Sequence, residues 1–209
     1  MKLVIFGATG QVGKYLVQQA LLMGHQVRAF GRNVHELPEE NPLLEKVKGA
    51  VFDPEEVAAA IRGTDAVVSA LGGSFDGMDK TRSLGIRNII AQMKATGVHR
   101  IVALGGAGIL DHPEGGLVID QETYPPEYLP VGREHQKAWE ALRDSGLSWT
   151  FVCSPDIVNA EVTGKFLTAQ NTLPVGALGK INAGDLALCM LQQLDNPAAL
   201  QARIGVSAV

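Results

Sequence analysis

The stretch Lys2-Leu3-Val4-Ile5-Phe6-Gly7-Ala8-Thr9-Gly10-Gln11-Val12-Gly13 decides the fold, because an apolar run leads directly into closely spaced glycines. The run predicts a buried strand, and the residues after Gly13 predict a helix whose first turn offers free N–H groups and a positive dipole end. Glycine at positions 7 and 10 removes Cβ atoms that would block a diphosphate, and Gly13 allows close packing of helix on strand. The stretch therefore predicts a phosphate-binding turn.

Composition limits the classes of protein to consider. The chain has 209 residues, of which 46% are hydrophobic and 19% charged, which favours one folded α/β domain over disorder. Its net charge of −4, with no long basic run, disfavours nucleic acid and anionic membranes as partners. Any bound phosphate must therefore be held by local groups.

The two cysteines, Cys153 and Cys189, stand in apolar stretches, and we expect buried, inert thiols. Their spacing supports no metal site, so none is predicted. The first apolar run is too short for a signal peptide or a membrane span, so we expect a cytoplasmic protein. No long exposed apolar stripe stands out, and we expect a monomer or a weak homodimer.

Short apolar segments alternate with helical ones along the whole chain. The expected strands are Lys2–Phe6, Gln26–Phe30, Val47–Phe52, Ala66–Ala70, Arg100–Leu104 and Ser148–Cys153. Four helices are expected from apolar residues at helical spacing. The first carries Val12, Leu16 and Ala20, and the second carries Ile86, Ile89, Ile90 and Met93. The third, Glu134–Ser145, carries Ala138, Ala141 and Leu142, and the last carries Leu186, Met190 and Leu194 and is capped by Asp185 or a neighbour. This βαβ alternation predicts a doubly wound, Rossmann-type parallel sheet in a single domain.

One long segment, from Asp111 to Pro130, interrupts the alternation with four prolines and two tyrosines. It follows the fifth expected strand, at the carboxyl edge where such sheets bind ligands. We interpret residues 105–130 as a loop on the substrate side and 155–209 as a small C-terminal substrate region; an ordinary surface loop is the alternative. Tyr124 and Tyr128 could stack on an aromatic ligand or simply hold the loop in place.

Residues at the other strand ends suggest which ligand binds. Arg32 follows the second strand, where an arginine suits the 2′-phosphate of NADP(H) and an acidic residue would suit NAD(H). We therefore favour NADP(H) and keep NAD(H) as the alternative. Asp53 could accept a hydrogen bond from adenine, cap the next helix, or do both. Small residues at Ala70 and Gly72 would let the backbone approach the cofactor.

These motifs, together with Leu142-Arg143-Asp144-Ser145-Gly146-Leu147, resemble an atypical short-chain dehydrogenase/reductase. The chain is similar to the NAD(P)H-binding group that contains biliverdin-IX-beta reductase (flavin reductase) and NmrA-like proteins. The resemblance implies a cofactor across the carboxyl edge, with the nicotinamide near the fifth and sixth strands. Its expected contacts are Gly7, Thr9, Gly10, Gln11, Val12, Arg32, Asp53, Ala70, Leu71, Gly72, Gly105, Pro155 and Ile157.

The chain departs from ordinary members of that superfamily at the catalytic positions. They use a serine and a Tyr-x-x-x-Lys pair, but here Arg133 stands four positions before Lys137, where the tyrosine would be. Gly106 stands where a serine is expected from the flavin-reductase relatives. His135 matches a histidine of the flavin-reductase relatives and could bind substrate or carry a proton; a solvent-facing residue is the alternative. Lys137 could touch a ribose or pair with Glu134 or Glu140.

Three functions remain open. The first is an NADPH-dependent reductase of a flavin, quinone or similar small conjugated acceptor, with the flavin as substrate rather than bound cofactor. His135 and Lys137 would be its catalytic residues, and Gly106, Tyr124, Tyr128 and Phe75 would contact the acceptor. The second is a catalytically silent NADP(H) sensor of the NmrA-like kind. The third is a nucleotide-sugar epimerase-like enzyme, which ranks last because that chemistry needs the Tyr–Lys pair.

Overall fold

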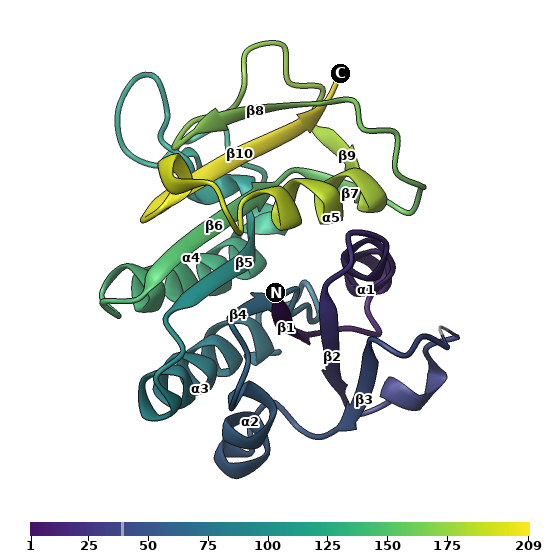
Figure 1. Ribbon diagram of the computed structural model, residues 1–209. Helices are drawn as coiled ribbons and strands as arrows, with labels where there is room; N and C mark the ends of the chain where they lie inside the picture. The colour runs from purple at the N-terminus through teal and green to yellow at the C-terminus, as the bar shows by residue number, and fades with distance from the viewer. Residues whose placement is uncertain (39) are drawn as a thin grey trace.

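A computed structural model describes residues 1–38 and 40–209 as a three-layer α/β domain (Figure 1). Its central sheet has eight strands in the order β3-β2-β1-β4-β5-β6-β10-β8. The strand pairs described are parallel except for β8, which runs antiparallel to β10. The strands are β1 Lys2–Phe6, β2 Gln26–Gly31, β3 Leu44–Lys48, β4 Ala66–Ser69, β5 Arg100–Gly106, β6 Ser148–Ser154, β8 Phe166–Gln170 and β10 Ala202–Ala208. This is the predicted Rossmann-type fold.

Helices cover both faces of the sheet, which explains why its central strands are apolar throughout. They are α1 Gln11–Leu22, α2 Pro54–Ile61, α3 Thr81–Thr96, α4 Leu129–Arg143 and α5 Ala183–Gln192. In Figure 1, α1 and α5 lie side by side on one face, and α2, α3 and α4 on the other. A small second sheet pairs β7 (Asp156–Val158) with β9 (Lys180–Asn182).

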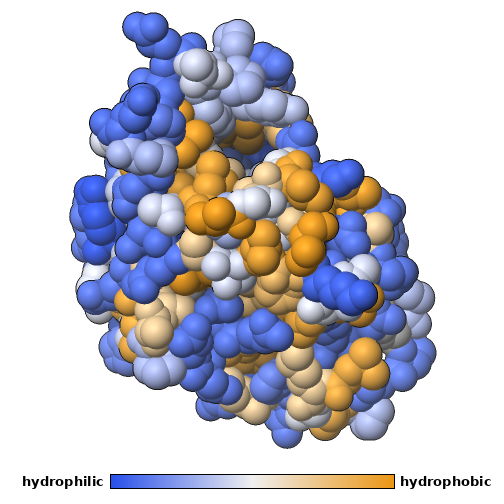
Figure 2. Space-filling model, turned by 90° about the horizontal axis from the view of Figure 1, so that it is seen from above, coloured by the Kyte–Doolittle hydropathy of each residue, from blue (hydrophilic) through white to orange (hydrophobic). Residues whose placement is uncertain are grey.

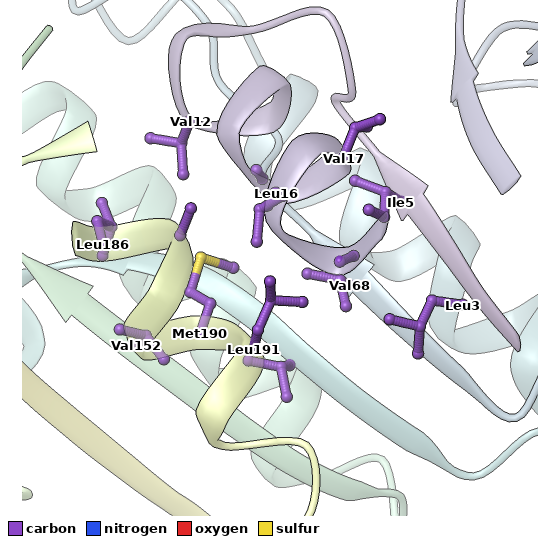
Figure 3. Close-up of a cluster of buried hydrophobic side chains, with 14 of the residues drawn as sticks. Leu3, Ile5, Val12, Leu16, Val17, Val68, Val152, Leu186, Met190 and Leu191 are labelled. Atoms are coloured by element: carbon purple, nitrogen blue, oxygen red, sulfur yellow. The ribbon is translucent and has the colours of Figure 1, made fainter. Parts of the chain in front are cut away.

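Two hydrophobic clusters fill the space between the layers. Between α1, α5 and the sheet, Leu16 meets Met190 and Leu191, while Ile5 and Val68 rise from the strands (Figure 3). Both cysteines are buried as expected, and burial raises the pKa of the Cys189 thiol to about 12. Burial also raises the pKa of Cys153.

The expected strand over Val47–Phe52 is wrong in its position. β3 runs from Leu44 to Lys48, with Leu44 beside Val27 and Lys48 beside Gly31. As an edge strand it is only partly buried, so it tolerates charged residues that disguise it in the sequence. The apolar residues after it, up to Phe52, line a cleft instead.

One predicted helix end needs correction, and the alternatives for another are decided. The helix expected from Glu134 begins at Leu129, with Pro130 in its first turn, where a missing N–H costs nothing. Asp185 does not cap α5: its neighbour Asn182 is the N-cap residue, without a side-chain bond. The Asp185 carboxylate accepts hydrogen bonds from the backbone of Thr163 and Gly164 instead.

Figure 2 views the molecule from the end where β8 and β10 lie. Hydrophobic side chains gather in the middle of this face, and hydrophilic ones surround them. Leu173, Val175 and Leu178, in the segment after β8, are among the exposed large hydrophobic residues of the chain. None of the helices in residues 1–38 and 40–209 combines the length and apolar character needed to cross a bilayer.

Candidate functional site: a cleft at the carboxyl edge of the sheet

A cleft of about 1040 Å3 runs along the carboxyl ends of β1, β2, β4, β5 and β6. Its volume is at the upper end for small-molecule sites, so it accommodates an extended ligand. Of the predicted cofactor contacts, it is lined by Gly7, Thr9, Gly10, Gln11, Val12, Arg32, Ala70, Leu71, Gly72, Gly105, Pro155 and Ile157. Gly106, Phe75, Tyr124, Tyr128 and His135 line it as well. The sheet thus brings together residues that lie far apart in the sequence.

The turn between β1 and α1 depends on glycine for two physical reasons. Gly7 has φ +77°, which L side chains rarely adopt, and a Cβ there would lie 2.5 Å from the Ala70 carbonyl oxygen. A Cβ at Gly13 would lie 1.9 Å from the Gly7 carbonyl oxygen. Gly13 therefore allows the close approach of helix to strand that the sequence predicts.

The first turn of α1 is built to receive an anion. Gly10 is its N-cap residue and provides no side-chain acceptor, and no acidic residue stands in the first turn. The N–H groups that open α1 therefore face the cleft without a competing carboxylate. Gln11 also reaches across the cleft, where its amide nitrogen donates to the Ile157 carbonyl oxygen at 3.3 Å.

The end of β2 places an exposed Arg32 in the lining. Asp53 does not line the cleft among the described residues; its carboxylate accepts hydrogen bonds from the N–H groups of Glu55 and Glu56. The capping alternative for Asp53 is therefore confirmed, and its contact with adenine stays a prediction. Beside it, Phe52 contributes a half-exposed ring to the lining, which the sequence interpretation missed because it assigned Phe52 to a strand.

Gly105 and Gly106, at the end of β5, allow two rings to pack closely against the strand, Phe151 at Gly105 and His135 at Gly106. A Cβ at Gly105 would lie 2.2 Å from the ring of Phe151. A Cβ at Gly106 would lie 3.0 Å from Cδ2 of His135. The imidazole thus lies against Gly106, the position for which the resemblance predicts a serine.

His135 is part-buried and faces the cleft, so the solvent-facing alternative is wrong. Its Nδ1 is buried and has no hydrogen-bond partner in the described chain. Burial, assisted by the positive charge of Arg82, lowers the pKa of His135 to about 3. The ring is therefore uncharged at neutral pH and can donate or accept a hydrogen bond, but it cannot attract an acid by charge.

Lys137 and Arg133 form ion pairs outside the cleft. Lys137 Nζ lies 2.8 Å from Oε1 of Glu134, and Arg133 lies 3.0 Å from Asp120. Neither is among the residues that line the cleft in the described chain. The ion-pair alternative for Lys137 is confirmed, and its contact with a ribose stays a prediction.

The rest of the cleft is largely apolar. Phe75 is 62% exposed, and its ring centroid lies 5.8 Å from the guanidinium carbon of Arg82. Arg82, which the sequence interpretation missed, donates to the carbonyl oxygens of Gly73 and Ser74 and so holds the segment that carries Phe75. In the sequence, the one feature that could have indicated Arg82 is its place in the first turn of α3.

The residues present fit a dinucleotide. A Cβ at Gly72 would meet no atom within 4 Å and would therefore stand in the open cleft, where a ligand backbone could lie. The uncapped turn of α1 suits a diphosphate, and Arg32 suits a further phosphate. The fold and site define a nucleotide-binding protein of the Rossmann class.

The chain belongs to the NAD(P)H-binding family, whose model matches residues 7–197. It is 30% identical to the uncharacterized protein YwnB of Bacillus subtilis, over 94% of this chain and 93% of that protein. It is 27% identical to the uncharacterized sugar epimerase YhfK of the same species, over 93% and 88%. SP1627 of Streptococcus pneumoniae, named a "putative NADH-flavin reductase", is 27% identical and superposes with a TM-score of 0.85 over 100% of both chains.

Proposed function

We propose that the protein is an NADPH-dependent reductase that transfers hydride to a flavin, quinone or similar conjugated acceptor. The observation that carries this proposal is the division of the cleft. One end offers an uncapped helix turn and Arg32 to phosphates, and the other offers aromatic and aliphatic side chains around an uncharged His135. A charged cofactor and a flat apolar acceptor would meet where these two ends join.

In this proposal the glycine turn and the start of α1 hold the diphosphate, and Arg32 holds the 2′-phosphate. The residues at 70–72 border the cofactor along the end of β4, and Ile157, fixed by Gln11, borders it along β7. When bound, NADPH supplies the hydride. The name of the streptococcal relative supports a reductase, while NADPH rather than NADH rests on Arg32.

The acceptor side lacks the hydroxyl relay of ordinary relatives, and this suits a conjugated acceptor. Such a ring takes its second proton from water, so placement matters more than acid catalysis. His135 orients the acceptor by a hydrogen bond rather than by charge, because burial keeps its ring neutral.

The two other functions are less well supported. An epimerase-like reaction needs the Tyr–Lys pair, and here Arg133 and Lys137 form ion pairs with Asp120 and Glu134. A silent NADP(H) sensor would need the same cofactor end of the cleft. It is therefore distinguished from a reductase by turnover alone.

The experiment is a panel of acceptors: FMN, riboflavin, menadione and biliverdin, each mixed with the protein and NADPH while the absorbance of NADPH is followed. We expect oxidation of NADPH with at least one of them, and slower oxidation with NADH. Tight NADPH binding without oxidation across the panel would instead establish the sensor.

A further inference from the structure

The hydroxyl of Tyr124 lies in a seam between the end of β5 and helix α4. A Cβ at Gly108 would lie 2.8 Å from this oxygen, and a Cβ at Gly132 would lie 2.9 Å from it. Both positions therefore have to be glycine for the phenol to reach this depth. Tyr124 is part-buried and lines the cleft, and its hydroxyl makes no hydrogen bond within residues 1–38 and 40–209. Its hydrogen-bonding capacity is thus left for a ligand.

His135 lies in the same seam. It contacts Gly106, two residues before Gly108, and it follows Gly132 by three positions on one face of α4. The phenol and the imidazole thus line the acceptor end of the cleft about one helical turn apart. Both groups are uncharged at neutral pH, since burial raises the pKa of Tyr124 and lowers that of His135.

Two charged groups of this wall, Arg82 and Asp79, form hydrogen bonds within the chain. Both terminal nitrogens of Arg82 donate to backbone carbonyl oxygens, at 2.9 and 3.0 Å, and its buried Nε has no hydrogen-bond partner among residues 1–38 and 40–209. The Asp79 carboxylate accepts from the N–H groups of Ser74 and Thr81. Asp156 is exposed at the start of β7 and would repel an anion. The acceptor end therefore offers hydrogen bonds to neutral oxygens, while carbonyl oxygens already occupy both terminal nitrogens of Arg82, the cation among its described lining residues.

We propose that the acceptor is an uncharged quinone and that the Tyr124 hydroxyl donates a hydrogen bond to one of its carbonyl oxygens. The inference rests on the proposed function. The quinone takes a hydride, which is two electrons and one proton, from the reduced nicotinamide, and a second proton from water. The products are the hydroquinone and NADP+, so atoms and electrons balance. Tyr124 positions the carbonyl and keeps its own proton.

The test is calorimetric titration of the NADP+-saturated protein with menadione, an uncharged quinone, and with FMN, which carries a phosphate. We expect menadione to bind more tightly than FMN. We expect Tyr124→Phe to weaken menadione binding by about tenfold, as loss of one hydrogen bond predicts. Tyr15→Phe is the matched control, because Tyr15 lies on α1 and its hydroxyl bonds to Glu161. The melting temperature of Tyr124→Phe should equal that of the wild type.

A second variant, Gly108→Ala, displaces the phenol without altering it, and it should also weaken menadione binding. Equal menadione affinity in the wild type and Tyr124→Phe, or tighter binding of FMN, would overturn the inference. Failure of the proposed function is a separate result, because it is absence of NADPH oxidation with every acceptor, whereas the titration measures binding alone.

Discussion

Gly7 needs glycine for two reasons, a positive φ and a close contact with β4. Gly24 shares the positive φ but lacks the close contact, so it allows the two effects to be measured separately. Gly7 has φ +77° and its Cβ would strike the Ala70 carbonyl, whereas Gly24 has φ +79° and its Cβ would meet nothing within 4 Å. We expect Gly24→Ala to cost about 1 kcal/mol of unfolding free energy, and Gly7→Ala to cost clearly more. Urea unfolding measures both, and equal costs would show that the contact with β4 does not constrain the turn.

Arg32 is the residue on which the choice of cofactor depends. We expect Arg32→Ala to weaken NADPH binding by roughly ten- to a hundredfold, as loss of hydrogen bonds to a charged phosphate predicts, and to change NADH binding little. Arg87→Ala, an exposed arginine on α3, is the control. Equal weakening of both cofactors, measured by titration calorimetry, would remove the assignment of the 2′-phosphate to Arg32.

At the scale of elements, the buried carboxylate of Glu134 joins α3 to α4. It accepts a hydrogen bond from Ser83 and forms ion pairs with Lys80 at 3.2 Å and Lys137 at 2.8 Å. These donors lower the pKa of Glu134 against the opposing effect of burial. The two helices therefore share a charged contact whose removal leaves donors without an acceptor.

We expect Glu134→Gln to lower the unfolding free energy by about 1–3 kcal/mol, since its amide cannot satisfy two ammonium groups. Glu140→Gln, on the same helix, should have little effect. The urea midpoint should fall with an unchanged slope. A variant as stable as the wild type would show that the contact contributes nothing to the packing of α3 on α4.

The elements also show which local signals are reliable. β1 has its predicted bounds because a buried strand next to a glycine turn is a local pattern. β3 lies elsewhere than predicted, because an edge strand is recognised by its pairing with β2 rather than by its own hydrophobicity. The pairing of β8 with β10, and of β7 with β9, joins distant segments and leaves no periodic signal in either.

At the scale of the whole molecule, the part-buried imidazole of His135 makes stability depend on pH. The pKa of His135 is about 3 in the folded chain, against 6.5 for a free histidine. Above pH 6.5 both states are neutral, so this group contributes nothing. Below pH 6.5 the imidazole of His135 binds a proton in the unfolded chain but stays neutral in the folded chain. As the pH is lowered, the unfolding free energy therefore decreases by up to about 1.4 kcal/mol per pH unit because of this residue.

We expect the melting temperature of His135→Gln to fall less than that of the wild type between about pH 7 and pH 5. Calorimetry at several pH values measures the difference. His99→Gln removes an exposed histidine and should keep the wild-type slope. If the slopes of all three proteins coincide, the imidazole is not held neutral by the fold.

The sequence by itself determined the alternation of strands and helices up to β6, the glycine turn and many of the residues that line the cleft at the strand ends, because these depend on short-range patterns. Only the tertiary structure decided where the catalytic candidates lie and what they contact. It places the part-buried ring of His135 against Gly106 and pairs Lys137 with Glu134. It also brings Tyr124 between Gly108 and Gly132. Burial, ion pairing and close contact between distant segments are properties of the packed chain, and no local pattern encodes them.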